Sequence, residues 1–405
     1  EINYLFSMKH RLFKCLFFSG LILILSSCEP KESNPYLLES IIEINIDLSN
    51  NRDLPLSELF REIEYVTLNT PENQIIGPFV KKIIQDDKIA LFDNQNSSMW
   101  VFNTEGEYLN RIEIKNGRGP GEVMHLSDMT FASNNTIHAL GAMKVLKFDL
   151  SGNLLNEFLF NGAVYQLSYF IEEGLYAGFA NNSFNIGFDE VSGKNLLIFD
   201  EYGTVVDGFL PIDERFDGLI YSTFNNFPVY GNTQLLFIHL IDKIFEISPD
   251  GVRTRYTLNF GKNSIPDEIF DHMSRYRRPL DFYRSEVVDN DYVAYIVQVG
   301  EVKNKLLLTV RMNHQNYTVI FNKETHNTTV HKNIINDIDF GFFPNLYTVH
   351  DNKLFARIEA IDIINRAKKL RESDIMISPE IASFLKLSES LTVESNPVLL
   401  IGTFH

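Results

Sequence analysis

Cysteine is nearly absent from this chain of 405 residues, which contains only Cys15 and Cys28. The sequence after residue 28 therefore has no disulfide and no thiol nucleophile, so its stability must come from a large core. Basic residues are also in deficit, with 36 Lys and Arg against 53 Asp and Glu and a formal net charge of −17. Nucleic acid is excluded as a partner, because binding to phosphates needs a basic surface.

Signatures of several enzyme classes are missing as well. There is no Gly-x-Ser-x-Gly motif, and the ten histidines show no His-Glu-x-x-His or paired spacing of metal ligands. The polar stretch 93–98 lacks the alternating acids and central glycine of a calcium loop. We therefore expect no metal and no cofactor, and we assign no catalytic residue. Carboxylates are abundant, so a pair of the glycosidase type stays open.

Long hydrophobic runs are missing except for Leu16–Leu25, which is too short to span a bilayer comfortably. It follows a basic stretch after Met8, the expected start, and residues 1–7 are interpreted as an upstream extension. The run ends in Leu25-Ser26-Ser27-Cys28, which resembles the lipobox of bacterial lipoproteins. The resemblance implies a signal peptide at 8–27, acylation of Cys28 and a lipidated tether at 28–40. The alternative is an ordinary secretory signal followed by a chance cysteine.

No long amphipathic helical pattern appears before about residue 265, and short aromatic and β-branched runs between turn residues indicate an all-β fold. One element recurs: an apolar residue, then Asn, Asp or Ser, two variable residues and Gly. It occurs at 102–106, 148–152, 199–203 and 247–251, with a degenerate copy at 321–325. In each copy we expect a hairpin whose Asn or Asp side chain caps the turn and whose glycine takes a positive φ.

A second element, a polar turn followed by an apolar strand, recurs six times. The copies are at 87–91, 135–139, 173–177, 232–236, 290–294 and 352–356. Two hairpins per unit of roughly fifty residues predict four-stranded blades, and six copies predict a six-bladed β-propeller. The alternative is a pair of β-sandwiches or a β-helix.

The sixth unit lacks its own outer turn, so we expect strands from both ends of the chain to complete it and close the ring. The strand-like candidates are 398–401, 42–46 and 63–66. Small helical insertions are expected at 266–278, 361–371 and 379–387, beside blades four to six. The last of these has Ser378 as its N-cap and Pro379 at its first position.

With these units, the lipobox and the segment Gly117–Glu122, the sequence resembles the lipoprotein six-bladed β-propeller family of gram-negative bacteria. That family is related in shape to NHL-repeat and Tol-system propellers. The resemblance covers residues 41–405 and implies architecture and location rather than a reaction. Gly117–Glu122 is expected to be a turn between blades, because it lacks the Lys-Ser/Thr ending and the following helix of a phosphate-binding loop.

Residues just before the innermost strands are expected to face a central pocket. Together with one arginine of the glycine-rich turn, the candidate ligand-binding residues are Arg118, His125, Tyr165, Tyr221, Tyr283, Arg284 and Tyr347. Aromatic rings with a few polar groups suit contact with a sugar or a peptide. The alternative is that these rings pack between blades. The basic stretch Arg275–Arg284 is either a partner surface or a solvated helix end.

These features predict a binding or scaffold module of the cell envelope, a monomer held at the outer membrane by its lipid alone. Its expected partner is an envelope protein or a small ligand such as a glycan or peptide. One alternative is a metal-dependent lyase or hydrolase with its site at the channel mouth. Another is a glycan-binding accessory to nutrient uptake.

Overall fold

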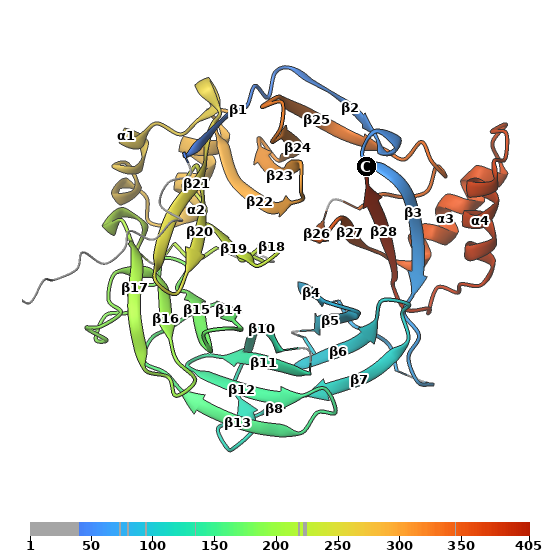
Figure 1. Cartoon of the computed structure of the whole chain (residues 1–405). Coiled ribbons are helices and arrows are strands. Elements are labelled where there is room, and N and C mark those ends of the chain that lie inside the picture. Colours follow the sequence, from blue (N-terminus) through green and yellow to red (C-terminus); the bar gives the residue numbers. More distant parts are fainter. Residues whose placement is uncertain are drawn as a thin grey trace, which may run out of the picture. The chain divides into compact units, whose positions relative to one another are not determined.

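Six β-sheets stand around a common centre in the computed structural model, as the repeats predict (Figure 1). The structure describes residues 40–405 except positions 73, 79, 80, 94, 134, 218, 222–224 and 345. By their contacts, Ser40–His405 form one unit. The expected signal peptide, Cys28 and all of the expected tether except Ser40 lie outside the described residues.

Blades 1 to 3 are simple four-stranded antiparallel sheets, in which the first strand is the innermost and the last is the outermost. Blade 1 has β4 (Lys81–Gln85), β5 (Lys88–Asp93), β6 (Ser98–Asn103) and β7 (Tyr108–Glu113). Blade 2 has β10 (Leu126–Ser133), β11 (Thr136–Gly141), β12 (Lys144–Asp149) and β13 (Leu154–Leu159). Blade 3 has β14 (Gln166–Phe170), β15 (Leu175–Phe179), β16 (Lys194–Phe199) and β17 (Val205–Pro211). The second and third strands are buried along nearly their whole length, because a neighbouring blade covers each of their faces.

Blades 4 to 6 follow the same plan. Blade 4 has β18 (Val229–Tyr230), β19 (Thr233–Phe237), β20 (Lys243–Ser248) and β21 (Gly251–Asn259). Blade 5 has β22 (Val293–Glu301), β23 (Lys305–Met312), β24 (Gln315–Asn322) and β25 (Thr328–Ile335). Blade 6 has β26 (Tyr347–His350), β27 (Lys353–Ile358), β28 (Val398–Phe404) and, as its outermost strand, β3 (Phe60–Thr67).

Strands from both ends of the chain close the ring in blade 6, which confirms the expected closure. β3 pairs antiparallel with β28, so that Tyr65 lies opposite Leu400. The expectation that 42–46 serves this blade is wrong. β1 (Ile42–Asn45) instead pairs parallel with β21 of blade 4, and β2 (Asn51–Pro55) pairs parallel with β25 of blade 5. Both become fifth strands, because Ile44 and Leu54 find buried positions against these blades.

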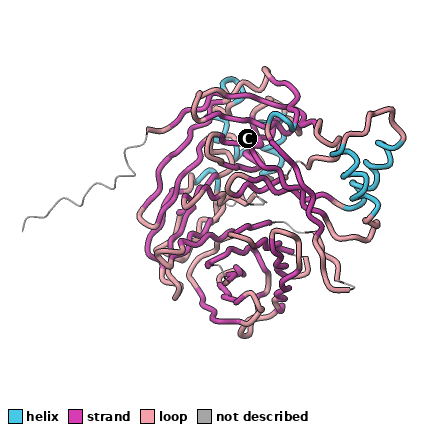
Figure 2. Tube along the Cα trace, turned by 45° about the vertical axis from the view of Figure 1, so that its right-hand side comes forward, coloured by secondary structure: helices cyan, strands magenta, loops and turns pink. Residues whose placement is uncertain are grey.

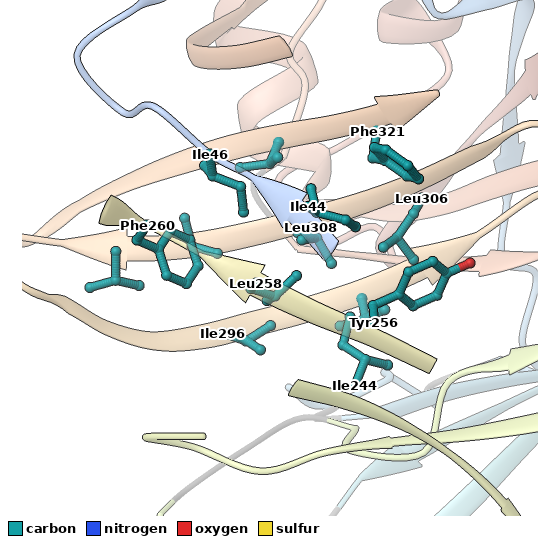
Figure 3. Packing of buried hydrophobic residues seen from close by; sticks show 14 of the residues in the cluster. Ile44, Ile46, Ile244, Tyr256, Leu258, Phe260, Ile296, Leu306, Leu308 and Phe321 are labelled. Atoms are coloured by element: carbon teal, nitrogen blue, oxygen red, sulfur yellow. The ribbon is translucent and has the colours of Figure 1, made fainter. Parts of the chain in front are cut away.

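The largest buried cluster lies between blades 4 and 5 and shows how the blades are held together (Figure 3). Ile44 of β1 packs there with Tyr256 and Leu258 of β21 and with Leu308 of β23. The first of the N-terminal strands therefore contributes apolar surface to the joint between two blades, and burial of each such side chain contributes about 1.5–3 kcal/mol.

The recurring glycines have two structural roles in blades 1 to 3. Gly106, Gly152 and Gly203 have φ of 83°, 86° and 85° in the turns before the outermost strands. A Cβ on Gly106 would lie 2.2 Å from the backbone oxygen of Thr67 in blade 6, and one on Gly203 would lie 2.0 Å from that of Leu159 in blade 2. The turns at Gly106 and Gly203 thus lean on the outermost strand of the preceding blade.

Two repeat copies differ from expectation. Gly251 lies in β21, outside the positive-φ region, and a Cβ there would have nothing within 4 Å. The copy at 290–294 precedes the innermost strand β22, whereas the turn from β22 to β23 lies at 302–304. The insertion between blades 4 and 5 ends just before β22. Its last polar residues match the repeat pattern without forming the turn between the first two strands.

Polar side chains on the innermost strands bind the next blade. Asp128 accepts the N–H of Leu167 at 2.8 Å, and its carboxylate lies 2.9 Å from the Lys81 ammonium of blade 1. Gln298 of blade 5 likewise accepts the N–H of Tyr347 in blade 6 at 3.1 Å. The single Asp128 side chain therefore joins three blades.

In the described part of the chain the α-helices lie in two insertions, and two short 3-10 helices, η2 (Leu56–Glu58) and η3 (Glu214–Phe216), lie elsewhere. α3 (Ala360–Arg371) and α4 (Pro379–Glu389) project from blade 6, and Ser378 caps α4 by accepting the N–H of Ile381, as predicted (Figure 2). The segment expected as one helix at 266–278 is instead two short turns, α1 (Asp267–Phe270) and η5 (Met273–Arg275). α2 (Pro279–Phe282) and the π-helical η6 (Tyr283–Val288) follow. No helix in the described part of the chain is both long and apolar enough to cross a membrane.

Because neighbouring strands within each blade run antiparallel, successive connections lie alternately on two opposite faces of the ring. The turns from the first to the second strand and from the third to the outermost strand share one face, and none exceeds the five residues of 200–204 and 323–327. The remaining connections share the opposite face, here called the top face. Its long connections are 68–80, 114–125, 180–193, 212–228, 260–292, 336–346 and 359–397. Because functional groups gather on loops held by a rigid scaffold, the top face is the place to look for a site.

Candidate functional site

The candidate residues of blades 1 to 3 lie in two connections of the top face. Arg118 and His125 are exposed in the connection from blade 1 to blade 2, and Tyr165 is half-buried in the next connection. Gly117–Gly121 lie between two short parallel strands, β8 (Lys115–Asn116) and β9 (Glu122–Val123). The Glu122 carboxylate accepts the N–H of Gly119 at 3.0 Å. The Glu157 carboxylate of blade 2 accepts the N–H of Gly121 at 2.6 Å. The segment is thus a tight turn between blades, as expected.

Tyr347 begins the innermost strand of blade 6 and is buried. Its hydroxyl lies 3.4 Å from that of Thr309, and burial raises its pKa. With its N–H bonded to Gln298, Tyr347 joins blades 5 and 6.

Two of the candidates, Tyr221 and Tyr283, come together on the top face with His239 from a third connection and Tyr295 from strand β22. The ring of Tyr221 lies 4.9 Å from that of His239, and His239 lies 5.2 Å from Tyr295. Tyr283 lies 6.3 Å from Tyr295 between ring centres. We call Tyr221, His239, Tyr283 and Tyr295 the aromatic cluster. Its three tyrosines are half-buried, so parts of their surfaces reach solvent.

The four residues of the aromatic cluster are uncharged near pH 7, and one charged residue, Arg311, contacts them. Burial lowers the pKa of His239 to about 4, so its imidazole is uncharged near pH 7, and its Nδ1 has no hydrogen-bond partner among the described residues. Burial, followed by the proximity of Tyr283, raises the pKa of Tyr221. Arg311 donates to the Tyr295 hydroxyl at 2.9 Å and is itself held by Asn316 at 2.7 Å.

Sequence reasoning missed Tyr295 and Arg311. They lie in β22 and β23, where an apolar pattern marks the strands and nothing local distinguishes a residue at the top face. His239, in the connection between β19 and β20, is buried. Only the spatial arrangement of blades 4 and 5 brings these three residues to Tyr221 and Tyr283.

The insertion that carries Tyr283, here called the cap segment (261–288), is firmly attached to the ring. Arg215, in the connection from blade 3 to blade 4, pairs with Asp267 and with Asp271, each at 2.9 Å. Phe216 packs edge-on against Phe270 with ring centres 4.8 Å apart. Phe216, Phe270 and Phe282 share one buried cluster, and Tyr283 packs against it.

On the opposite face, a cavity of about 390 Å³ lies among the turns of blades 4 to 6. Its lining residues are Tyr230, Gly231, Lys303, Asn304, Asp351, Asn352 and His405. One side of the Tyr230 ring is covered by the Lys323 ammonium at 4.3 Å, and that ammonium also pairs with the buried Glu301. The Lys323 ammonium beside this cavity is therefore already engaged by Tyr230 and Glu301 of the protein itself. Elsewhere too, no three His, Cys, Asp or Glu side chains within the described ranges converge as metal ligands.

Comparison with known proteins places the chain in a family. No curated protein matches it. A solved structure of a protein described as exported, from Bacteroides fragilis, has a TM-score of 0.71 at 18% identity and covers 90% of this chain and 100% of its own. A DUF4221 family member from Bacteroides vulgatus has a TM-score of 0.48 at 11% identity over 86% of this chain and 98% of its own. The first likeness supports the propeller fold. A family profile matches residues 39–403, and the chain therefore belongs to the family described as domain of unknown function DUF4934.

Proposed function

We propose that this protein is a binding module of the cell envelope that takes its ligand on the top face, at the aromatic cluster. The observation that carries the proposal is the convergence of Tyr221, Tyr283 and Tyr295, from separate connections and a strand, at half-buried positions on a rigid ring. Half-buried tyrosines offer ring faces together with hydroxyls, the mixture that binding sites for small ligands use. Fold alone does not determine function, so the proposal depends on this cluster.

The attachment to the envelope is proposed from the sequence. The basic and apolar stretch before Leu25-Ser26-Ser27-Cys28 supports export and acylation at Cys28. The similarly folded Bacteroides fragilis protein is described as exported, which agrees with this location. The outer membrane is the proposed membrane, with the acyl chains as the anchor, because the acidic chain has no overall electrostatic attraction to anionic lipid headgroups.

The anchor is testable by metabolic labelling. We expect Cys28→Ser to abolish incorporation of radiolabelled palmitate and to release the protein from the membrane fraction. Cys15→Ser is the matched control, because it removes the other cysteine and leaves Cys28 in place, and it should retain the label. Label that persists in Cys28→Ser would show that the anchor lies elsewhere or is absent.

The binding site is testable with paired tyrosine variants. Purified full-length protein in detergent would be titrated calorimetrically with a panel of oligosaccharides and peptides. For ligands that bind, we expect Tyr221→Ala with Tyr283→Ala to weaken affinity at least about tenfold, because two ring faces are lost. Tyr202→Ala is the control, since Tyr202 is 84% exposed in a turn on the opposite face. Equal affinity in the double variant and the control would remove the aromatic cluster from the site.

A further inference from the structure

The cap segment concentrates positive charge beside the aromatic cluster. Arg275, Arg277, Arg278 and Arg284 lie within ten residues, and all four are exposed. Arg284 directly follows Tyr283 in η6. The chain as a whole has 53 acids and 36 bases, so this stretch stands out against an acidic background.

One of these arginines is paired within the cap segment, and the other three are open to solvent. Arg278 forms a bidentate pair with Asp281 at 2.7 and 2.8 Å. The guanidinium groups of Arg275, Arg277 and Arg284 form no hydrogen bond and no ion pair with any residue that the structure describes. Arg275 and Arg284 act on carboxylates only through space, as minor contributions to the lowered pKa of Glu286 and of Asp281. Carboxylates are not scarce nearby, since Arg215 alone binds Asp213, Asp267 and Asp271 at the edge of the same segment. The three exposed guanidinium groups are therefore available to an external anion.

Arginine suits such an anion chemically. Its planar guanidinium binds a carboxylate or sulfate through two parallel hydrogen bonds and stays charged at every physiological pH. The aromatic cluster adds no negative charge: His239 has a pKa of about 4 and is neutral near pH 7, and the Arg311 guanidinium beside Tyr295 is positive. Selection for negative charge would thus come from the cap segment, while the tyrosines supply ring contact.

From this arrangement we infer that the ligand is an acidic glycan, a chain of sugar rings bearing carboxylate or sulfate groups. The inference rests on the proposed binding function and specifies its ligand. Pyranose rings would pack against Tyr221, Tyr283 and Tyr295, and their acidic groups would pair with Arg275, Arg277 and Arg284. A peptide held by apolar anchors or by strand addition fits less well, and an acidic peptide would pair with the arginines without offering flat rings to the three tyrosines. In the cap segment Phe270 and Phe282 are buried, and Leu280 is the exposed large apolar side chain.

The first test compares charged and neutral probes on the purified full-length protein in detergent. Calorimetric titration with oligogalacturonate should give saturable binding, whereas neutral maltooligosaccharide of equal length should bind at least tenfold more weakly. Raising NaCl from about 50 to about 300 mM should weaken the oligogalacturonate affinity severalfold, because salt screens exposed charges. An oligoglutamate peptide of equal charge is the third probe and should bind more weakly than oligogalacturonate.

The second test uses two variants with the same change in net charge. Arg275→Gln/Arg277→Gln/Arg284→Gln should weaken oligogalacturonate binding at least tenfold. Lys332→Gln/Lys368→Gln/Lys369→Gln removes three exposed cations from β25 and α3 and should change it less than twofold. Circular dichroism and melting temperatures should match the unmodified protein in both, because the substituted side chains are exposed.

The outcomes separate the inference from the proposed function. Equal binding of neutral and acidic sugars, with no effect of the arginine variant, would overturn the acidic-glycan inference and leave binding at the aromatic cluster intact. Arginine-dependent binding of oligoglutamate without binding of oligogalacturonate would replace the glycan by an acidic peptide. Oligogalacturonate binding that survives loss of Tyr221 and Tyr283 but not of the arginines would overturn the proposed role of the aromatic cluster.

Discussion

Replacing Asp128 by alanine is expected to lower the free energy of unfolding by about 3–5 kcal/mol. Its carboxylate and the Lys81 ammonium are both almost completely buried, with side chains 3% and 4% exposed, and lie 2.9 Å apart. Burial raises the pKa of Asp128 even though Lys81 lies beside it. Because the pair is buried, removing the carboxylate leaves the Lys81 ammonium inside the protein without its counter-charge. The N–H of Leu167 in the next blade also loses its acceptor. Chemical denaturation of the purified variant measures the loss.

The controls for Asp128→Ala distinguish an unpaired charge from lost packing. The double variant Lys81→Met/Asp128→Leu removes both charges and should be more stable than Asp128→Ala, because apolar replacements of buried ion pairs are often tolerated. Glu58→Ala breaks the pair with Arg52, whose side chains are about half exposed, and should change stability little. A single variant as stable as the unmodified protein would show that the three blades do not depend on this carboxylate.

Gly203→Ala is the second substitution with a large expected effect, a loss of about 2–4 kcal/mol. The residue has φ of 85°, a conformation that an alanine adopts only with strain. Its Cβ would also lie 2.0 Å from the backbone oxygen of Leu159 in the preceding blade, and a backbone atom cannot move aside as a flexible side chain can. The turn would have to lift away from blade 2. Denaturant unfolding, followed by tyrosine and tryptophan fluorescence, measures the loss.

Gly251→Ala is the matched control, since Gly251 occupies the corresponding position of the repeat in blade 4. Its φ lies outside the left-handed region, and a Cβ would have nothing within 4 Å. The substitution should leave stability unchanged or raise it by about 0.4–1 kcal/mol, because alanine restricts the unfolded chain. Equal losses in Gly203→Ala and Gly251→Ala would contradict the contact between blades 2 and 3 as the reason for the glycine.

Local features of the sequence were sufficient to predict the blades but not all of their partners. The turns at Gly106 and Gly203 can be recognised in the sequence, because a hairpin of this kind requires a fixed order of residue types within a few positions. The pairing of Ile44 with blade 4 was not predictable, because a strand of four residues can add to several sheet edges and packing alone selects among them. The same limit applies to the site. Tyr283 could be proposed from its place before a strand, whereas Tyr295 and Arg311 reach the aromatic cluster only through the tertiary arrangement of blades 4 and 5.

The closure of blade 6 also has a kinetic consequence. β3 is made early in synthesis, but its partner β28 begins at residue 398, and the paired residues Thr67 and Val398 are 331 positions apart in the sequence. Contacts of such long range slow folding, because loop-closure entropy is lost before the contact forms. Until then β3 is an unpaired strand, the kind of segment that recruits other chains. Arg61, Glu62 and Glu64 place three charges on it, and all three are exposed in the finished ring. Charges on an unpaired strand oppose pairing with other chains, so we expect these three to limit aggregation while the last blade is incomplete.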